Sequence, residues 1–100
     1  MENKPNTTER ALAILKCLKG RSLTGLTNKE LSEAICQSAV NTSRAVAILV
    51  KAGFVTQLET GRYALSVQML QIATAHAREI QSASDRIAQL EQRVQAGSFN

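Results

Sequence analysis

Residues 27–53 read TNKELSEAICQSAVNTSRAVAILVKAG, and this stretch decides the fold. It opens with Thr27-x-x-Glu30, a pattern in which each side chain bonds the other's backbone amide at the start of a helix. Ser38 is a second candidate N-cap, and apolar residues then recur at helical spacing until Gly53, a residue type that commonly ends helices. We therefore predict two helices joined by a compact turn at 36–37, with the second helix running over residues 38–52.

The flanking segments add one more helix and a hairpin. Upstream, residues 11–18 carry apolar side chains at helical spacing; residues 7–10 can cap this helix and Gly20 can end it. Downstream of Gly53 the pattern changes to two short strands, 54–58 and 62–65, around the turn 59–61, whose glycine suits a left-handed conformation. The order helix, helix, helix, hairpin predicts a winged helix-turn-helix, a mainly α fold with a small β-hairpin.

Residues 66–96 contain neither Gly nor Pro, so we expect one long C-terminal helix with Ser66 as its cap. Apolar residues follow each other in alternating steps of four and three, a near-heptad pattern typical of helices that self-associate. The stripe could instead pack on its own domain. We expect a dimer or a higher oligomer, because such a helix would extend about 45 Å, further than a small domain can cover. The predicted seam residues are Ile80, Ala83, Ile87, Leu90 and Val94.

These predictions divide the chain into a winged helix-turn-helix domain at 1–66, an oligomerisation helix at 67–96 and a frayed tail at 97–100. The composition argues against an enzyme, because a single His and a single Asp cannot supply a catalytic triad or a His-rich metal site. We expect no cofactor and no metal. Cys17 and Cys36 have no metal-ligand spacing, and we expect two reduced, packed thiols. No apolar run is long enough for a membrane span and the N-terminus is unlike a signal peptide, so a cytoplasmic (bacterial cytosol or nucleoid) location is expected.

The basic residues are concentrated in the first two-thirds of the chain. The net charge is +4. Residues 1–66 hold nine Lys and Arg against five Asp and Glu, whereas residues 67–100 hold three of each. The excess therefore lies wholly in the predicted helix-turn-helix domain, where it favours an anionic partner.

Three stretches resemble the DNA-binding domain of the IclR family of bacterial transcription regulators. They are ERALAILKCL at 9–18, LTNKELSEAICQSAVNTSRAVAILVKAGFV at 26–55 and GRYALSVQML at 61–70. The sequence departs from the family pattern at Val40-Asn41, where Ser-Thr is usual before the Arg. The resemblance implies a double-stranded DNA partner. The family's large C-terminal effector-binding domain does not fit within 100 residues, so we expect no small-molecule effector.

A recognition helix at 38–52 would place its N-terminal residues against base edges in the major groove, and a wing at 58–62 would touch the backbone. Thr42, Ala45, Val46 and Leu49 should form its buried face. Asn41 suits an adenine edge, Arg44 a guanine or a phosphate, and Val40 a thymine methyl. Lys29 opposes the helix dipole and so suggests a phosphate partner. The predicted DNA-binding residues are Lys29, Ser38, Val40, Asn41, Ser43, Arg44, Thr60, Gly61 and Arg62.

Plainer interpretations stay open for these residues. Arg44 could pair with Glu30 or Glu33, and Lys29 and Asn41 could be solvated surface residues. At the level of the whole protein, the sequence predicts a sequence-specific DNA-binding transcription regulator that acts as a dimer or higher oligomer. The alternative is a protein-interaction adaptor, similar to an antirepressor, that uses the winged helix as a docking surface.

Overall fold

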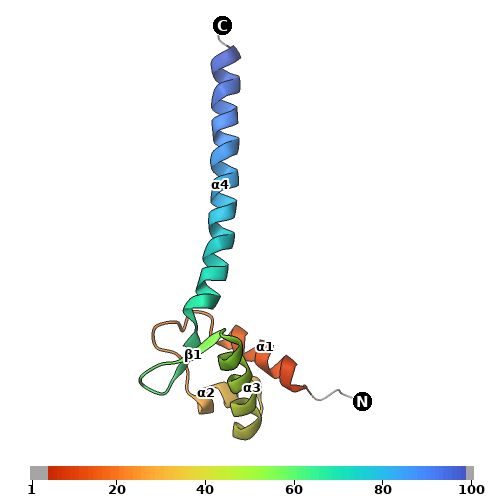
Figure 1. Ribbon diagram of the computed structural model, residues 1–100. Helices are drawn as coiled ribbons and strands as arrows, with labels where there is room; N and C mark the ends of the chain where they lie inside the picture. Colours follow the sequence, from red (N-terminus) through yellow and green to blue (C-terminus); the bar gives the residue numbers. More distant parts are fainter. Residues whose placement is uncertain (1–4, 99–100) are drawn as a thin grey trace. The chain divides into compact units, whose positions relative to one another are not determined.

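The computed structural model describes residues 5–98. Along the chain it contains α1 (Thr7–Cys17), α2 (Asn28–Ile35), α3 (Ala39–Ala52), β1 (Val55–Gln57), β2 (Tyr63–Leu65) and α4 (Val67–Ser98). Three helices, an antiparallel hairpin and a long final helix confirm the predicted fold class (Figure 1). The chain divides into two compact units, one ending at Leu70 and the other beginning at Gln71, and each is described by itself.

The caps of α2 and α3 are those that the sequence predicts. The Thr27 amide donates to Glu30 Oε1 at 3.0 Å and the Glu30 amide donates to Thr27 Oγ1 at 3.1 Å, which completes the capping box. Ser38 Oγ accepts from the Asn41 amide at 3.1 Å at the start of α3. Gly53 follows α3 with a φ of 88°, in the left-handed region that favours glycine. A side-chain cap at Ser38 and the backbone conformation of Gly53 therefore define the two ends of the predicted recognition helix.

The ends of α1 differ from the prediction. Residues 7–10 are not its cap but its first turn, and the cap is Asn6, whose Oδ1 accepts from the Glu9 amide at 2.8 Å. The helix ends at Cys17 rather than at Gly20. Asn is as good an N-cap as Ser or Thr. Because Asn6, Thr7 and Thr8 are all suitable caps, the sequence does not determine where this helix begins.

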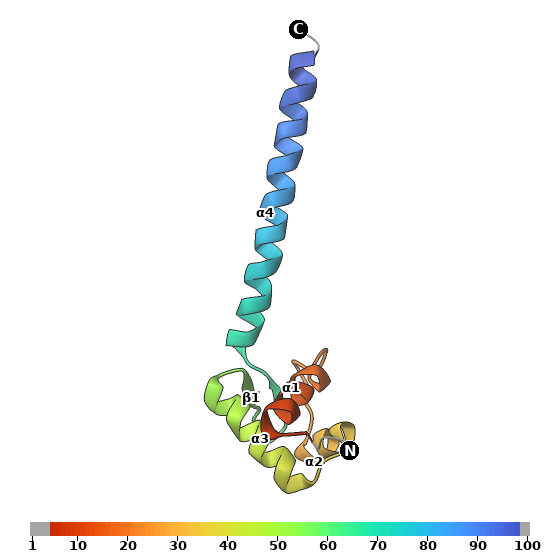
Figure 2. The same cartoon turned by 90° about the vertical axis from the view of Figure 1, so that its right-hand side faces the viewer.

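The core of this unit lies where α1, α2, α3 and β1 meet, and Figure 2 shows the three helices gathered beside the hairpin. Ile14, Leu18 and Leu31 are completely buried there. The predicted buried face of α3 is confirmed, and the one polar member of that face, Thr42, donates its hydroxyl to the Ser38 carbonyl at 2.8 Å. Burying a hydroxyl that has a hydrogen-bond partner costs little free energy, so Thr42 is compatible with a place in the core.

The hairpin is shorter than predicted, with three residues in each strand and Val55 opposite Leu65. The structure adds a contact that the sequence did not predict. Leu26 exchanges two backbone hydrogen bonds with Tyr63, at 2.9 Å and 2.8 Å, so that the segment before α2 forms a bridge to β2. The base of the wing is therefore joined by backbone bonds to the loop that leads into the helix-turn-helix.

Cys17 and Cys36 are not joined by a disulfide, and they are not both packed. Cys17 lies half-buried against the core. Cys36 is exposed in the turn between α2 and α3, with a φ of 56°. The prediction of two packed thiols is therefore wrong for Cys36, because the turn that the helix-turn-helix requires turns this side chain outwards.

Ser66 caps α4 as predicted, since its Oγ accepts from the Met69 amide at 3.1 Å. The helix continues through Gly97 to Ser98, so residues 97 and 98 of the predicted tail are helical, and residues 99–100 lie outside the described part of the chain. No residue of α4 in this range is buried. Within residues 5–98, none of the helices combines the length and the apolar character that crossing a lipid bilayer demands.

Candidate nucleic-acid interface

The first two turns of α3 carry most of the predicted DNA-binding residues. Val40, Ser43 and Arg44 are exposed, whereas Asn41 is half-buried. At 100° per residue, Val40 and Arg44 lie roughly 40° apart on the helix surface, with Ala47 and Lys51 further along the same stripe. The structure therefore gathers Val40, Arg44, Ala47 and Lys51 on one exposed face of α3, and it directs Asn41 away from the centre of that face. Lys51 was missed by sequence reasoning, although its spacing of seven residues from Arg44 is a usable signal.

Arg44 has no carboxylate partner within residues 5–98. The ion pair found in this part of the chain joins Arg62 to Glu30, not Arg44 to Glu30 or Glu33. The plainer interpretation of Arg44 as half of a surface pair is therefore not what the structure contains. Its guanidinium remains available to a ligand that approaches the exposed face of α3.

Asn28 connects the start of α2 to the start of α3. Its Nδ2 donates to the Ala39 carbonyl at 3.3 Å, and its Oδ1 accepts from the Ser43 hydroxyl at 3.3 Å. These bonds join the first turn of α2, which also carries the exposed Lys29, to the N-terminal turns of α3. Sequence reasoning missed Asn28, because a partner 15 residues away leaves no local signal.

The wing divides into an exposed tip and an anchored base. Thr60 and Gly61 are exposed, and Gly61 has the predicted left-handed φ of 87°. Arg62 is bound to its own chain: Nε donates to the Thr24 carbonyl at 2.9 Å, and Nη2 donates to the Gly25 carbonyl at 3.1 Å. Nη2 also forms an ion pair with Glu30, 3.0 Å from its Oε1. The predicted DNA contact of Arg62 stays a prediction, and the structure gives this side chain an intrachain role beside it.

Glu30 is the ionisable group whose environment is most clearly perturbed. Hydrogen bonds from the Thr27 amide and hydroxyl lower the pKa of Glu30 below its ordinary value of 4.5, and the charges of Arg62 and Arg21 lower it further. A carboxylate that accepts backbone N–H bonds is stabilised in its charged form. Glu30 therefore neutralises part of the positive charge at the wing base, whereas Arg44 and Lys51 of α3 form no ion pair with any residue from 5 to 98.

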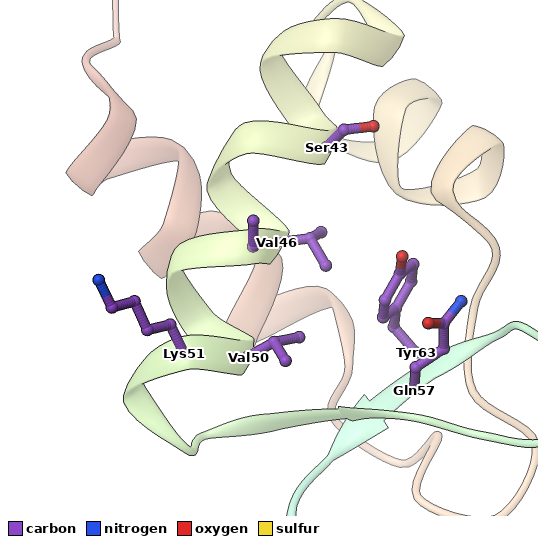
Figure 3. A pocket seen from close by; sticks show the side chains of 7 residues that line it. Ser43, Val46, Val50, Lys51, Gln57 and Tyr63 are labelled. Carbon is purple, nitrogen blue, oxygen red and sulfur yellow. The ribbon is translucent and has the colours of Figure 1, made fainter.

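A hollow of about 310 Å³ lies between α3 and the hairpin (Figure 3). Tyr63 and Gln57 from the hairpin lie opposite Val46 and Val50 of α3, with Ser43 one turn away and Lys51 pointing to the other side of the helix. The hollow has an apolar floor and polar groups around it. It separates the recognition helix from the wing and lies beside the exposed stripe of α3.

A three-helix core, a tight turn between α2 and α3, an exposed face on α3 and a two-stranded wing define a winged helix-turn-helix, a class of DNA-binding domain. The model of the IclR helix-turn-helix domain family matches residues 7–59. This range is more than half of the chain, and the chain belongs to that family.

A solved structure supports the same assignment. The chain is similar to a protein from Silicibacter sp. TM1040 described as an ICLR transcriptional regulator, with 29% sequence identity and a TM-score of 0.62. The similarity covers 81% of this chain and 33% of the other, so this chain spans about a third of that protein's length. No curated protein matches the chain.

Proposed function

We propose that the protein is a sequence-specific, double-stranded DNA-binding transcription regulator. The observation that carries the proposal is the exposed stripe of α3, where Arg44 and Lys51 are solvent-accessible and Arg44 has no carboxylate partner within residues 5–98. This stripe belongs to the part of the chain that holds the whole net charge of +4. Phosphates attract such a surface over distance, and base edges are then read at contact range.

In this proposal α3 enters the major groove and the wing lies on the backbone. Arg44 reaches a guanine edge or a phosphate, and Ser38, Val40 and Ser43 lie on the turns nearest the bases. Asn41 would need a rotamer that brings its amide out of its half-buried position. Lys29, Thr60 and Gly61 are exposed and suit phosphate contacts, which position the domain without reading sequence.

We further propose that α4 joins two or more copies of the chain. The apolar heptad stripe of this helix supports self-association, because its large side chains are more than half exposed in the single chain. These are Ile80, Ile87, Leu90 and Val94. Such a continuous apolar row is typical of a surface that a partner covers. In a parallel pair, Arg86 of one chain could reach Glu91 of the other. A two-fold dimer would read inverted half-sites about 10 bp apart, unless α4 sets a wider spacing.

Duplex binding at several salt concentrations tests the function. We expect the binding constant to fall steeply as salt rises, because phosphate contacts release counterions. Arg44→Gln should weaken binding to the selected site by roughly tenfold or more, a loss of 1–3 kcal/mol. Arg78→Gln is the matched control, since it removes the same charge from the exposed surface of α4. Equal binding by the two variants, or no salt-sensitive binding to any duplex, would contradict the proposal.

A further inference from the structure

The exposed stripe of α3 carries two apolar side chains, Val40 and Ala47. Val40 is 59% exposed, and Ala47 is exposed seven residues further on, roughly 20° away around the helix. On the same stripe Arg44 lies between them, and Lys51 follows Ala47 one turn later. The sequence of α3, AVNTSRAVAILVKA, contains no acidic residue. The surface that would meet a DNA groove therefore alternates apolar and cationic side chains along the helix.

The short polar side chains near the stripe either form a hydrogen bond within the chain or lie on another side of the helix. The Ser43 hydroxyl donates to Asn28 Oδ1 at 3.3 Å. Asn41 is half-buried and lies on another side of the helix. The hydrogen-bonding capacity of the stripe thus rests on Arg44 and Lys51, and most of its remaining contact area is apolar.

Only one base offers a large apolar group to the major groove. Thymine carries a C5 methyl, whereas cytosine offers an amino donor that Glu or Asp would accept, and α3 has neither residue. We propose that Val40 and Ala47 read the C5 methyl groups of thymines in the half-site, on either side of the position contacted by Arg44. This inference rests on the proposed function and specifies which base the site prefers.

The spacing limits how far apart those thymines lie. Seven residues of α-helix rise about 10.5 Å, close to three base-pair steps. The helix need not follow the groove along its whole length, so the two thymines should lie at most three base-pair steps apart. The cations on the same stripe favour DNA over an apolar protein surface as the occupant, because an apolar partner would have to desolvate Arg44 and Lys51.

Replacing thymine by deoxyuridine removes the methyl and keeps the base pairing. The full chain is first used to select a duplex from a random pool, and each thymine of the selected half-site is then replaced in turn. We expect affinity to fall about fourfold at one or two positions, the effect of withdrawing one buried methyl. Positions outside the half-site should show no change.

Variants of α3 identify the residue that reads each methyl. Val40→Ser should abolish the difference between thymine and uracil at one position and leave the salt dependence as in the wild type. Ile48→Ser is the matched control, since Ile48 is 51% exposed on α3 but roughly 80° from Val40 around the helix. It should keep the full difference. Circular dichroism checks that both variants fold.

The outcomes separate this inference from the proposed function. Salt-sensitive duplex binding with no difference between thymine and uracil at any position overturns the methyl readout alone. A difference that survives Val40→Ser and Ala47→Ser overturns the assignment to these two residues. Absence of binding to every duplex overturns both the inference and the function on which it rests.

Discussion

Arg62 and Glu30 hold the base of the wing against the first turn of α2, with 3.0 Å between Nη2 and Oε1. The same guanidinium donates to the carbonyls of Thr24 and Gly25, so that one side chain joins three segments of the chain. The planar fork of arginine suits such divergent bonds better than a lysine ammonium does. The position of the wing relative to the recognition helix therefore depends on an arginine that sequence reasoning placed on the DNA.

Arg62→Ala should lower the free energy of unfolding by about 1 kcal/mol, because two backbone carbonyls lose a charged donor at a partly exposed site. Arg62→Lys should recover only part of the loss, since it keeps the charge and not the fork. Urea unfolding followed by circular dichroism measures both variants. An unchanged urea midpoint for Arg62→Ala would show that the contacts of Arg62 within the chain contribute nothing to stability. The salt dependence of duplex binding tests the phosphate contact separately: if Arg62 contacts a phosphate, Arg62→Ala should reduce the salt slope by about one.

Glu30 should make the free energy of unfolding depend on pH in the acidic range. Its folded-state pKa is lowered by the Thr27 bonds first and by Arg62 and Arg21 after them. The folded state therefore binds the proton less readily than the unfolded chain does, and the stabilisation is present above pH 4.5 and disappears as the pH falls through the lower, folded-state value. We expect the stability difference between wild type and Glu30→Gln to shrink over that window. A difference that stays constant from pH 6 to pH 3 would contradict this origin.

Gly25 is required where the loop passes under the wing. Its φ is +68°, and an added Cβ would lie 2.6 Å from the Tyr63 carbonyl oxygen. Gly25→Ala should therefore destabilise the fold by well over 1 kcal/mol, combining backbone strain with a displaced Leu26–Tyr63 bridge. Gly61→Ala is the matched control, because its φ of +87° carries the strain and nothing lies within 4 Å of the added Cβ. Equal midpoints for the two variants in urea would show that the close approach is unimportant.

The sequence predicts the parts of this fold that local chemistry determines. The caps at Thr27, Ser38 and Ser66 and the glycine after α3 were correct, because each satisfies its own helix end within three or four residues. The buried face of α3 was correct because its period follows directly from helix geometry. The cap of α1 was wrong since Asn6 competes with several equally suitable neighbours.

Contacts between residues far apart in the chain could not be predicted from the sequence. Neither the bridge from Leu26 to Tyr63 nor the bonds from Asn28 to α3 can be derived from spacing, because the partners meet only after the helices pack. Arg62 shows the consequence for the candidate site. A cation beside a turn glycine is typical of a DNA-binding wing, yet its partners lie 32 to 38 residues away. The charge of Arg62 follows from the sequence, but its hydrogen bonds and ion pair within the chain do not.

Self-association through α4 is tested by a charge placed on its apolar stripe. Ile87 is 59% exposed in the single chain and occupies the heptad row with Ile80 and Val94. Ile87→Lys should weaken a dimer by on the order of a hundredfold, because two copies each lose the burial of an isoleucine, about 3 kcal/mol together. Gln92→Lys adds the same side chain five residues away, outside that row, and should leave the assembly intact. Sedimentation velocity over a range of concentrations distinguishes the species. Wild-type chain that stays monomeric at high micromolar concentration would contradict the proposed role of α4, and so would an unchanged assembly of Ile87→Lys.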